Sequence, residues 1–190
     1  MILLVLGRRG CGKTTLVKER IREGAKGKYL IFDTLAEYGD LGTVTTTRKQ
    51  FVDYVSDNHE KTFRIVFQPM YDSLDTSFDT FMATAWELKN NTIVIDEIDS
   101  VSGPTSVPES LARNLRYGRH RNIDVIAASR RASDVPRLLT SQADEIVSFN
   151  QGEPRDLAYL AKYISIDFAE RTKRLAKFEH LSYRWEEGIS

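Results

Sequence analysis

The chain of 190 residues contains a single cysteine, Cys11, and this scarcity excludes a scaffold built on intramolecular disulfide bonds. It also lacks an apolar run near the roughly 18 residues that a helical membrane span requires. The apolar start, residues 1–6, is short and has no basic residue before it, so we expect neither a signal peptide nor a membrane anchor. A free cysteine without a targeting segment favours a reducing, intracellular compartment.

An excess of charge of either sign is also missing. Lys and Arg total 27 and Asp and Glu total 27, so the formal net charge is zero. This balance argues against a uniformly basic nucleic-acid-binding protein, although it leaves local basic patches open. Apolar residues make up 41% of the chain and charged residues 28%, which is ordinary for a globular protein. The length predicts one domain, residues 1–190, with one hydrophobic core.

Short apolar runs alternate with amphipathic stretches along the chain. The apolar runs predict strands at residues 1–6, 29–32, 63–67, 92–95, 123–128 and 145–149. The spacing of apolar residues predicts helices at residues 13–23, 47–58, 72–89 and 108–117, and two more that fill residues 153–178. Residues 183–185 fit a last strand at the sheet edge. The alternation predicts an α/β fold with a mostly parallel central sheet and helices on both faces.

The first turn of the chain matches the phosphate-binding motif G-x-x-x-x-G-K-[ST]. Its glycines let the backbone curl so that N–H groups point at phosphate oxygens, and the next helix presents its positive N-terminal end to the same anion. Lys13 is expected to reach the β- and γ-phosphates of ATP, and the Thr14 hydroxyl to bind Mg²⁺. Cys11 is interpreted as a small spacer whose alkylation would block ATP binding by its bulk. The predicted ATP-binding residues are Gly7, Arg8, Arg9, Gly10, Cys11, Gly12, Lys13, Thr14 and Thr15.

The apolar strand at residues 92–95 ends in two acids, Asp96 and Glu97, in the Walker B form. Asp96 is expected to hold Mg²⁺, usually through water, and Glu97 to orient and deprotonate the attacking water. An acidic strand end or a helix cap could show the same dipeptide, but the preceding phosphate loop favours the catalytic interpretation. A water-activating glutamate suits ATP hydrolysis better than phosphoryl transfer to a small acceptor.

Seven arginines and no lysine occur between residues 113 and 137. Guanidinium groups bind phosphate in bidentate fashion. The segment could therefore contact a nucleic-acid backbone, or send an arginine finger to the γ-phosphate of a neighbouring subunit. For any single arginine, a solvated face with intramolecular salt bridges is the alternative. The seven are Arg113, Arg116, Arg119, Arg121, Arg130, Arg131 and Arg137.

In these motifs and in three further stretches, the chain resembles the FtsK/HerA superfamily of DNA-pumping P-loop ATPases over nearly its whole length. Phe32-Asp33 followed by Glu37-Tyr38 is similar to the D-x-x-x-E-Y stretch of HerA-like proteins. Residues 118–121 and 129–136 resemble the family's G-R-x…T-Q-R-P-S-D-V-P segment, and residues 141–144 its S-Q-A-D stretch. A chain close to a bare ATPase core is similar to the small genome-packaging ATPases of tailless, membrane-containing viruses. The resemblance implies a P-loop NTPase fold of the RecA/ASCE-like kind.

The resemblance also implies roles for individual residues. Arg119 matches the trans-acting finger, with Arg116 and Arg121 as alternatives. Ser129 stands where the family usually has a sensor glutamine. Either Ser129 acts through a bridging water, or Arg130 or Gln142 replaces it. The implied catalytic residues are Lys13, Glu97, Arg119 and Ser129, and the implied metal ligands are Thr14 and Asp96.

The function implied by the resemblance is an ATP- and Mg²⁺-dependent motor that pumps double-stranded DNA into a viral capsid. Its expected location is the host cytoplasm or the virion. Its expected partners are double-stranded DNA, further copies of the chain in a pentameric or hexameric ring, and capsid, portal or membrane-vertex proteins. The DNA-contacting loop could be residues 68–76 or residues 102–108.

Three alternatives stay open from the sequence. An assembly motor of a filamentous phage or a secretion system shares most of these motifs. A small nucleotide kinase shares the fold size and the arginines, but seldom needs a glutamate at the position of Glu97. A non-hydrolysing interaction module would keep an ATP site only to stabilise a ring.

Overall fold

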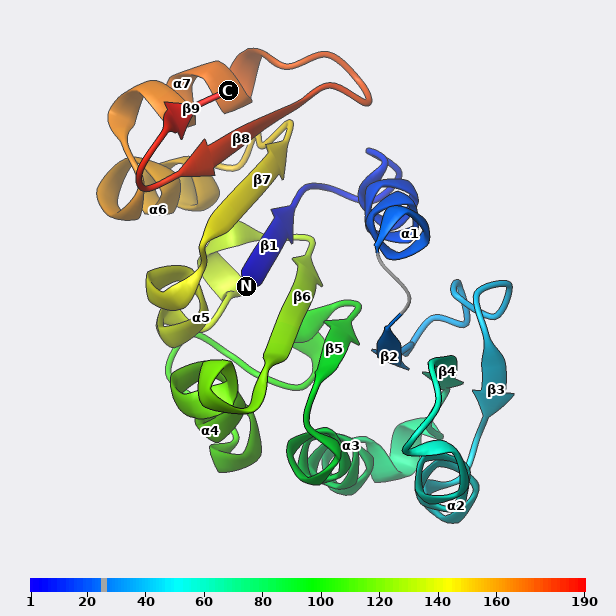
Figure 1. The fold of residues 1–190 in the computed structure, drawn as a ribbon. Coiled ribbons are helices and arrows are strands. Elements are labelled where there is room, and N and C mark those ends of the chain that lie inside the picture. The colour runs from blue at the N-terminus through cyan, green and yellow to red at the C-terminus, as the bar shows by residue number, and fades with distance from the viewer. Residues whose placement is uncertain (25–26) are drawn as a thin grey trace.

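The computed structural model describes residues 1–24 and 27–190 of the chain. In this part of the chain, one sheet holds the strands in the order β3-β4-β2-β5-β6-β1-β7-β8-β9 (Figure 1). The strands are β1 (Ile2–Leu6), β2 (Lys28–Phe32), β3 (Thr43–Thr45), β4 (Phe63–Phe67), β5 (Asn91–Ile95), β6 (Ile123–Ser129), β7 (Glu145–Phe149), β8 (His180–Arg184) and β9 (Gly188–Ile189).

Helices and short 3₁₀ turns connect these strands. The α-helices are α1 (Lys13–Glu23), α2 (Arg48–Asn58), α3 (Leu74–Leu88), α4 (Glu109–Tyr117), α5 (Arg137–Gln142), α6 (Pro154–Tyr163) and α7 (Ile166–Arg174). The 3₁₀ turns are η1 (Tyr71–Ser73), η2 (Ile98–Ser100), η3 (Gly118–Arg121) and η4 (Ala132–Asp134). Local chemistry sets some of the helix starts: Thr47 and Gln50 form a capping box at α2, and the Ser165 hydroxyl caps α7.

The strands from β3 to β7 pair in parallel, whereas β8 and β9 are antiparallel additions at one edge. β1 lies between β6 and β7, with Leu3 opposite Ile126 on one side and Glu145 on the other. Parallel strands end at the same edge of a sheet, so the carboxyl ends of β1, β2, β5, β6 and β7 meet there.

Successive residues of each strand face opposite layers, as the period of two requires. In β1, Leu3 and Val5 pack with Val17 of α1 on one face, and Leu4 and Leu6 belong to the apolar cluster of the other face. Figure 1 shows the strands as an arc with α1 on its inner side and α2 to α6 along its outer side. The predicted α/β fold, with a mostly parallel sheet between helices, is confirmed.

The C-terminal part corrects one prediction. The two helices do not fill residues 153–178, because α7 ends at Arg174 and a loop leads to β8. Leu175 already has extended backbone, with φ −61° and ψ 137°, and Phe178 has a left-handed φ of 73°. The last strand expected near residues 183–185 is present as β8, which pairs with β7, and the short β9 lies beyond it at the edge of the sheet. Among the described residues, no helix is both long and apolar enough to cross a bilayer.

Candidate functional site

The phosphate-binding turn joins β1 to α1 at the carboxyl edge of the sheet. Gly12 caps α1 with φ 111°, a left-handed conformation that favours glycine. A Cβ at Gly7 would lie 2.6 Å from Cys11 Sγ and 2.7 Å from Phe149 Cβ, so only glycine fits between the turn and β7. Packing and backbone geometry therefore fix the curl that aims N–H groups at an anion.

Lys13 is almost fully buried at the start of α1, with 6% of its surface exposed. Its Nζ donates one long hydrogen bond, of 3.5 Å, to the carbonyl oxygen of Arg8. No salt bridge to this ammonium occurs within residues 1–24 and 27–190. A buried ammonium without a paired carboxylate suits an anionic ligand such as phosphate. Thr15, which is the last of the predicted ATP-binding residues and lies in the first turn of α1, is exposed.

The segment after β2 brings a carboxylate and a phenol to the same edge. Asp33 is buried and accepts hydrogen bonds from the backbone N–H groups of Glu37 and Tyr38, both at 3.0 Å, and from Gln68 Nε2 at 2.8 Å. These bonds fold residues 33–38 back over the sheet edge. The Thr14 hydroxyl then donates to Glu37 Oε2 at 2.7 Å. The sequence resemblance marked Asp33, Glu37 and Tyr38 without assigning them a role.

Asp96, at the end of β5, lies beneath this segment. Its side chain is 2% exposed, and Oδ1 is 3.5 Å from the Tyr38 hydroxyl, which donates to it. Its Oδ2 is buried and has no hydrogen-bond partner among the described residues. Burial, with the carboxylates of Glu97, Glu37 and Asp33, raises the pKa of Asp96 to about 7.

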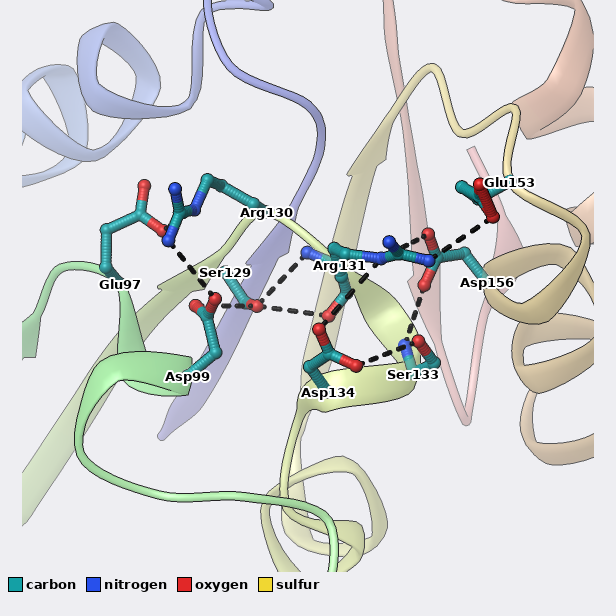
Figure 2. A network of polar contacts seen from close by, with 9 residues as sticks. All are labelled: Glu97, Asp99, Ser129, Arg130, Arg131, Ser133, Asp134, Glu153 and Asp156. Atoms are coloured by element: carbon teal, nitrogen blue, oxygen red, sulfur yellow. Dashed lines mark hydrogen bonds and ion pairs between the residues drawn. The ribbon is translucent and has the colours of Figure 1, made fainter.

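Glu97 has a left-handed backbone conformation, with φ 53° and ψ 59°, which is uncommon for a non-glycine residue. Its carboxylate is buried, and Oε2 lies 2.7 Å from Arg130 Nε in an ion pair (Figure 2). Burial and the charge of Asp99 raise the pKa of Glu97, while Lys13 and Arg130 oppose the rise. The glutamate is thus held by an arginine from the end of β6.

Ser129, the last residue of β6, is fully buried. Its hydroxyl is 3.0 Å from Asp99 Oδ1 and 3.0 Å from the carbonyl oxygen of Arg131, and it accepts from the Arg131 N–H at 3.2 Å. These protein contacts occupy the single proton of the hydroxyl and one of its two acceptor lone pairs (Figure 2). Of the two expected substitutes, Arg130 reaches Glu97 and Asp99, at 2.7 and 3.7 Å. Gln142, the last residue of α5, lies at the amino edge of the sheet, where the Asp144 N–H donates to the Ile2 carbonyl oxygen. It is therefore at the edge opposite the phosphate loop and does not take the sensor position.

Arg131 turns away from Arg130 and towards α6, as Figure 2 shows. Its guanidinium forms ion pairs with Glu153 at 3.4 Å and with the buried Asp156 at 3.4 Å. Asp156 also accepts a hydrogen bond from the Ser133 N–H at 2.9 Å. Arg131 therefore ties the end of β6 to α6 and is a structural member of the arginine segment.

The other arginines divide into engaged and exposed groups. Arg113 and Arg121 hold the ring of Trp86 between them, at 4.6 and 4.5 Å from guanidinium carbon to centroid. Arg121 Nε also donates to the Trp86 carbonyl oxygen at 2.9 Å. Arg116 and Arg119 are exposed, and neither forms a salt bridge or side-chain hydrogen bond within the described part of the chain. Arg119 lies in η3 before β6, at the edge opposite the phosphate loop.

Arg137 also has an intramolecular partner, because its guanidinium carbon is 3.9 Å from the centroid of the Tyr163 ring. Cys11 is buried, and burial raises the pKa of its thiol.

Both proposed DNA loops lack basic residues: residues 68–76 contain two aspartates, and residues 102–108 contain no charge. Within residues 68–76, Met70 and Tyr71 are the exposed apolar side chains.

The family of the chain follows from a match over residues 3–151 to the ATPase family associated with various cellular activities (AAA). No protein of curated function matches the chain.

Solved structures similar to the chain include the genome packaging NTPase B204 of Sulfolobus turreted icosahedral virus 2. In its complex with ATP-gammaS, that protein is 25% identical and has a TM-score of 0.80, and the alignment covers 100% of this chain and 94% of that chain. VirB4 of Thermoanaerobacter pseudethanolicus is 12% identical with a TM-score of 0.62, over 94% of this chain and 87% of that chain. The pCW3 conjugation coupling protein TcpA is 16% identical with a TM-score of 0.59, over 99% of this chain and 58% of that chain. The last two similarities concern the fold.

Proposed function

The chain belongs to the ATPase family associated with various cellular activities, and from this membership we propose that it is the DNA-translocating motor of a viral genome-packaging machine. One observation carries the proposal: nearly the whole length of both chains aligns with the genome packaging NTPase B204, at 25% identity and a TM-score of 0.80.

The site residues fit ATP with Mg²⁺. Lys13 supplies a buried ammonium, which forms no salt bridge within the described residues, for the β- and γ-phosphates. Thr14 supplies a hydroxyl, and Asp96 a buried carboxylate oxygen without a hydrogen-bond partner among the described residues. One carboxylate together with substrate phosphates is the usual way in which proteins bind Mg²⁺. When bound, Mg²⁺ would neutralise phosphate charge and polarise the γ-phosphoryl group.

Glu97 is the general base that we propose for the attacking water. Burial raises its pKa, which makes the carboxylate a better proton acceptor than an exposed one. We assign Arg130 as the residue that positions Glu97, in place of the sensor glutamine, because its Nε lies 2.7 Å from the carboxylate. Ser129 would support this arrangement by fixing Asp99 and the backbone of Arg131.

The catalytic site would be completed by a neighbouring subunit. Arg119 and Arg116 are the expected finger residues, because both are exposed and form no salt bridge within the described part of the chain. Arg121 is engaged with Trp86 and is a poorer candidate. Since Arg119 lies at the edge opposite the phosphate loop, it would act on the next subunit of a ring of five or six copies.

In this proposal, the assembled ring binds double-stranded DNA in the host cytoplasm or at the virion, and docks on capsid, portal or membrane-vertex proteins. The loops at residues 68–76 and 102–108 carry no positive charge. We therefore expect them to contribute polar and apolar contacts, while arginines contact DNA phosphates.

A conjugation or secretion motor is the second candidate function. It is favoured by the fold similarity to TcpA and VirB4, at TM-scores of 0.59 and 0.62. Such a motor would share the ATP site and differ in its partners. A small nucleotide kinase is disfavoured by the buried Glu97 beside the phosphate loop.

The experiment that tests the proposal is an ATPase assay with and without double-stranded DNA. The wild-type protein should hydrolyse ATP faster when DNA is present, and Lys13→Ala should abolish hydrolysis in both conditions. A rate that is unaffected by DNA in the assembled protein would contradict the translocation function while leaving the ATPase activity standing.

A further inference from the structure

A pocket lies between the phosphate loop, the end of β7 and the loop that precedes β8. It has a volume of about 310 Å³ and is lined by residues 8–11 together with Asn150, Leu175 and Lys177. The phosphate loop provides one wall, the end of β7 the second and the loop before β8 the third. Residues 8–11 belong to the phosphate-binding motif, whereas Asn150, Leu175 and Lys177 belong to no motif identified in the sequence.

Phe178 follows Lys177, which lines this pocket, and its ring lies close to Gly12 of the phosphate loop. Its Cδ1 is 3.5 Å from the position that a Cβ at Gly12 would take. The ring is 61% exposed, and the Lys177 ammonium lies 4.8 Å from its centroid. Its backbone has a left-handed φ of 73°. A large aromatic side chain is therefore exposed to solvent near a phosphate-binding turn, on a backbone conformation that is rare for a non-glycine residue, and its ring face is available for stacking.

The direction of a bound nucleotide follows from the order of the strands. The γ-phosphate must lie near Asp96 and Glu97, which end β5, on the β6 side of β1. The nucleoside must then leave the phosphate loop on the opposite side, where β7 and β8 lie. Figure 1 shows the loop between α7 and β8 extending from that side towards α1. The pocket thus occupies the side on which the nucleoside emerges.

Asn150 adds a hydrogen-bonding preference to the pocket. Its Nδ2 donates to the carbonyl oxygens of Lys173 and Leu175, at 3.0 and 2.9 Å. Two carbonyl partners fix the orientation of the amide, because only the nitrogen can donate to them. Within residues 1–24 and 27–190 no hydrogen bond to the carboxamide oxygen occurs, so this oxygen of a pocket-lining residue is available as an acceptor. A base with an exocyclic amino group matches it, and a base with a carbonyl at the same position does not.

We propose that this pocket binds the nucleobase of ATP, with Phe178 stacked on the base and Asn150 Oδ1 accepting a hydrogen bond from the 6-amino group of adenine. The pocket would select adenine over hypoxanthine and guanine, whose 6-oxo group would face the Asn150 oxygen. Lys177 and Arg8 would lie beside the ribose and the α-phosphate. The inference rests on ATP binding at the phosphate loop and is independent of DNA.

The test is equilibrium binding, without DNA, of ATP, inosine triphosphate and inorganic tripolyphosphate to the full chain. Inosine triphosphate differs from ATP at the amino group, and tripolyphosphate lacks the nucleoside. The wild-type protein should bind inosine triphosphate about tenfold more weakly than ATP. Phe178→Ala should weaken both nucleotides by about tenfold and leave tripolyphosphate unchanged. Lys13→Ala should weaken all three ligands.

Tyr117→Ala is the matched control, since Tyr117 is a 55% exposed aromatic residue at the other edge of the sheet. It should bind all three ligands as the wild type does. Equal affinities of the wild type for ATP and inosine triphosphate would overturn the role of Asn150. Unchanged ATP affinity in Phe178→Ala, or an equal loss for tripolyphosphate, would overturn the pocket. If the three ligands behave as expected but DNA does not stimulate hydrolysis, the base pocket stands and the packaging function fails.

Discussion

The two carboxylates that end β5 are neighbours in sequence, yet the fold gives them different surroundings. Asp96 faces the Tyr38 hydroxyl and leaves one buried oxygen without a partner among the described residues, whereas Glu97 meets Arg130. The left-handed backbone at Glu97 separates the two side chains. A free oxygen suits a metal ligand, and a carboxylate held by a cation suits a positioned base.

The raised pKa of Asp96 predicts that this residue destabilises the metal-free fold at alkaline pH. The pKa of this acid is about 7 in the folded state and near 4 in the unfolded state. Its contribution to the free energy of unfolding is therefore fully present below pH 4 and is lost as the pH rises to about 7, because the buried carboxylate must then carry its charge. Asp96→Asn should therefore raise the free energy of unfolding at pH 8 by up to about 4 kcal/mol, and by less at pH 5.

Urea unfolding in a chelator at both pH values measures this effect. The same variant should be inactive as an ATPase, because the metal ligand is lost. An increase in stability that is equal at pH 5 and pH 8, or a loss of stability at pH 8, would contradict the assignment of the raised pKa.

Arg130 has a predicted effect on the rate and on its pH dependence. Arg130→Ala should lower the ATPase rate by about tenfold or more, because Glu97 loses the contact that holds its carboxylate. It should also move the acid limb of the pH–rate profile to higher pH, since Arg130 opposes the rise in the pKa of Glu97. Arg130→Lys, which keeps the charge, should move the limb less. A lower rate with an unshifted profile would indicate a purely structural role.

At the scale of elements, periodicity predicted the long helices and the buried strands well. The apolar residues of α1, α3 and α4 recur at helical spacing, and each lies on the sheet as predicted. β3 and α5, of three and six residues, were missed because such short segments carry little periodic signal. The end of α7 was placed too late, since Leu175 and Phe178 fit a helical face although they form the loop beside the phosphate turn.

For the candidate site, the motifs predicted the phosphate loop and the acid pair, because short local spacing encodes them. The contacts between segments could not be predicted. Arg130 meets Glu97, and Glu37 meets Thr14, only after the strands are ordered in the sheet. The arginine segment is the clearest case, since one run of sequence contributes to a Trp86 stack, to the catalytic edge and to the exposed surface.

The Trp86 stack predicts opposite results for two nearby arginines. Arg121→Ala should lower the free energy of unfolding by about 1 to 2 kcal/mol, because it removes a cation–π contact and a hydrogen bond that join α3 to η3. Arg119→Ala, in the same turn but exposed, should change it by less than about 0.5 kcal/mol. Urea unfolding of both variants measures the difference. A reversed order would mean that Arg119 has the structural role.

At the scale of the whole molecule, the net charge of zero hides a separation of charges. Seven arginines lie between residues 113 and 137, and five of them are engaged within the subunit by Trp86, Glu97, Tyr163 or Asp156. This segment of a single subunit thus offers few free arginines to DNA, since only Arg116 and Arg119 are exposed without a salt bridge in the described part of the chain. We expect DNA binding to require the ring, in which the free arginines of several copies act together.

This expectation gives a prediction for the dependence of DNA binding on salt and on protein concentration. The logarithm of the affinity should fall with the logarithm of the salt concentration with a slope of about −3 or steeper, and binding should disappear below the concentration at which the ring assembles. Fluorescence anisotropy of a labelled duplex, with sedimentation as the control for assembly, measures both. Binding by isolated subunits, insensitive to salt, would contradict the expectation.

In the proposed DNA motor, ATP is hydrolysed at a site shared between neighbouring subunits. The most direct measurement is the DNA-stimulated ATPase rate of wild-type protein mixed with increasing fractions of Arg119→Ala protein, at constant total concentration. A site shared in this way requires that the rate falls faster than the fraction of wild-type subunits, because each variant subunit also disables its neighbour. A rate that falls in direct proportion to the wild-type fraction, or one that double-stranded DNA does not stimulate, would contradict it.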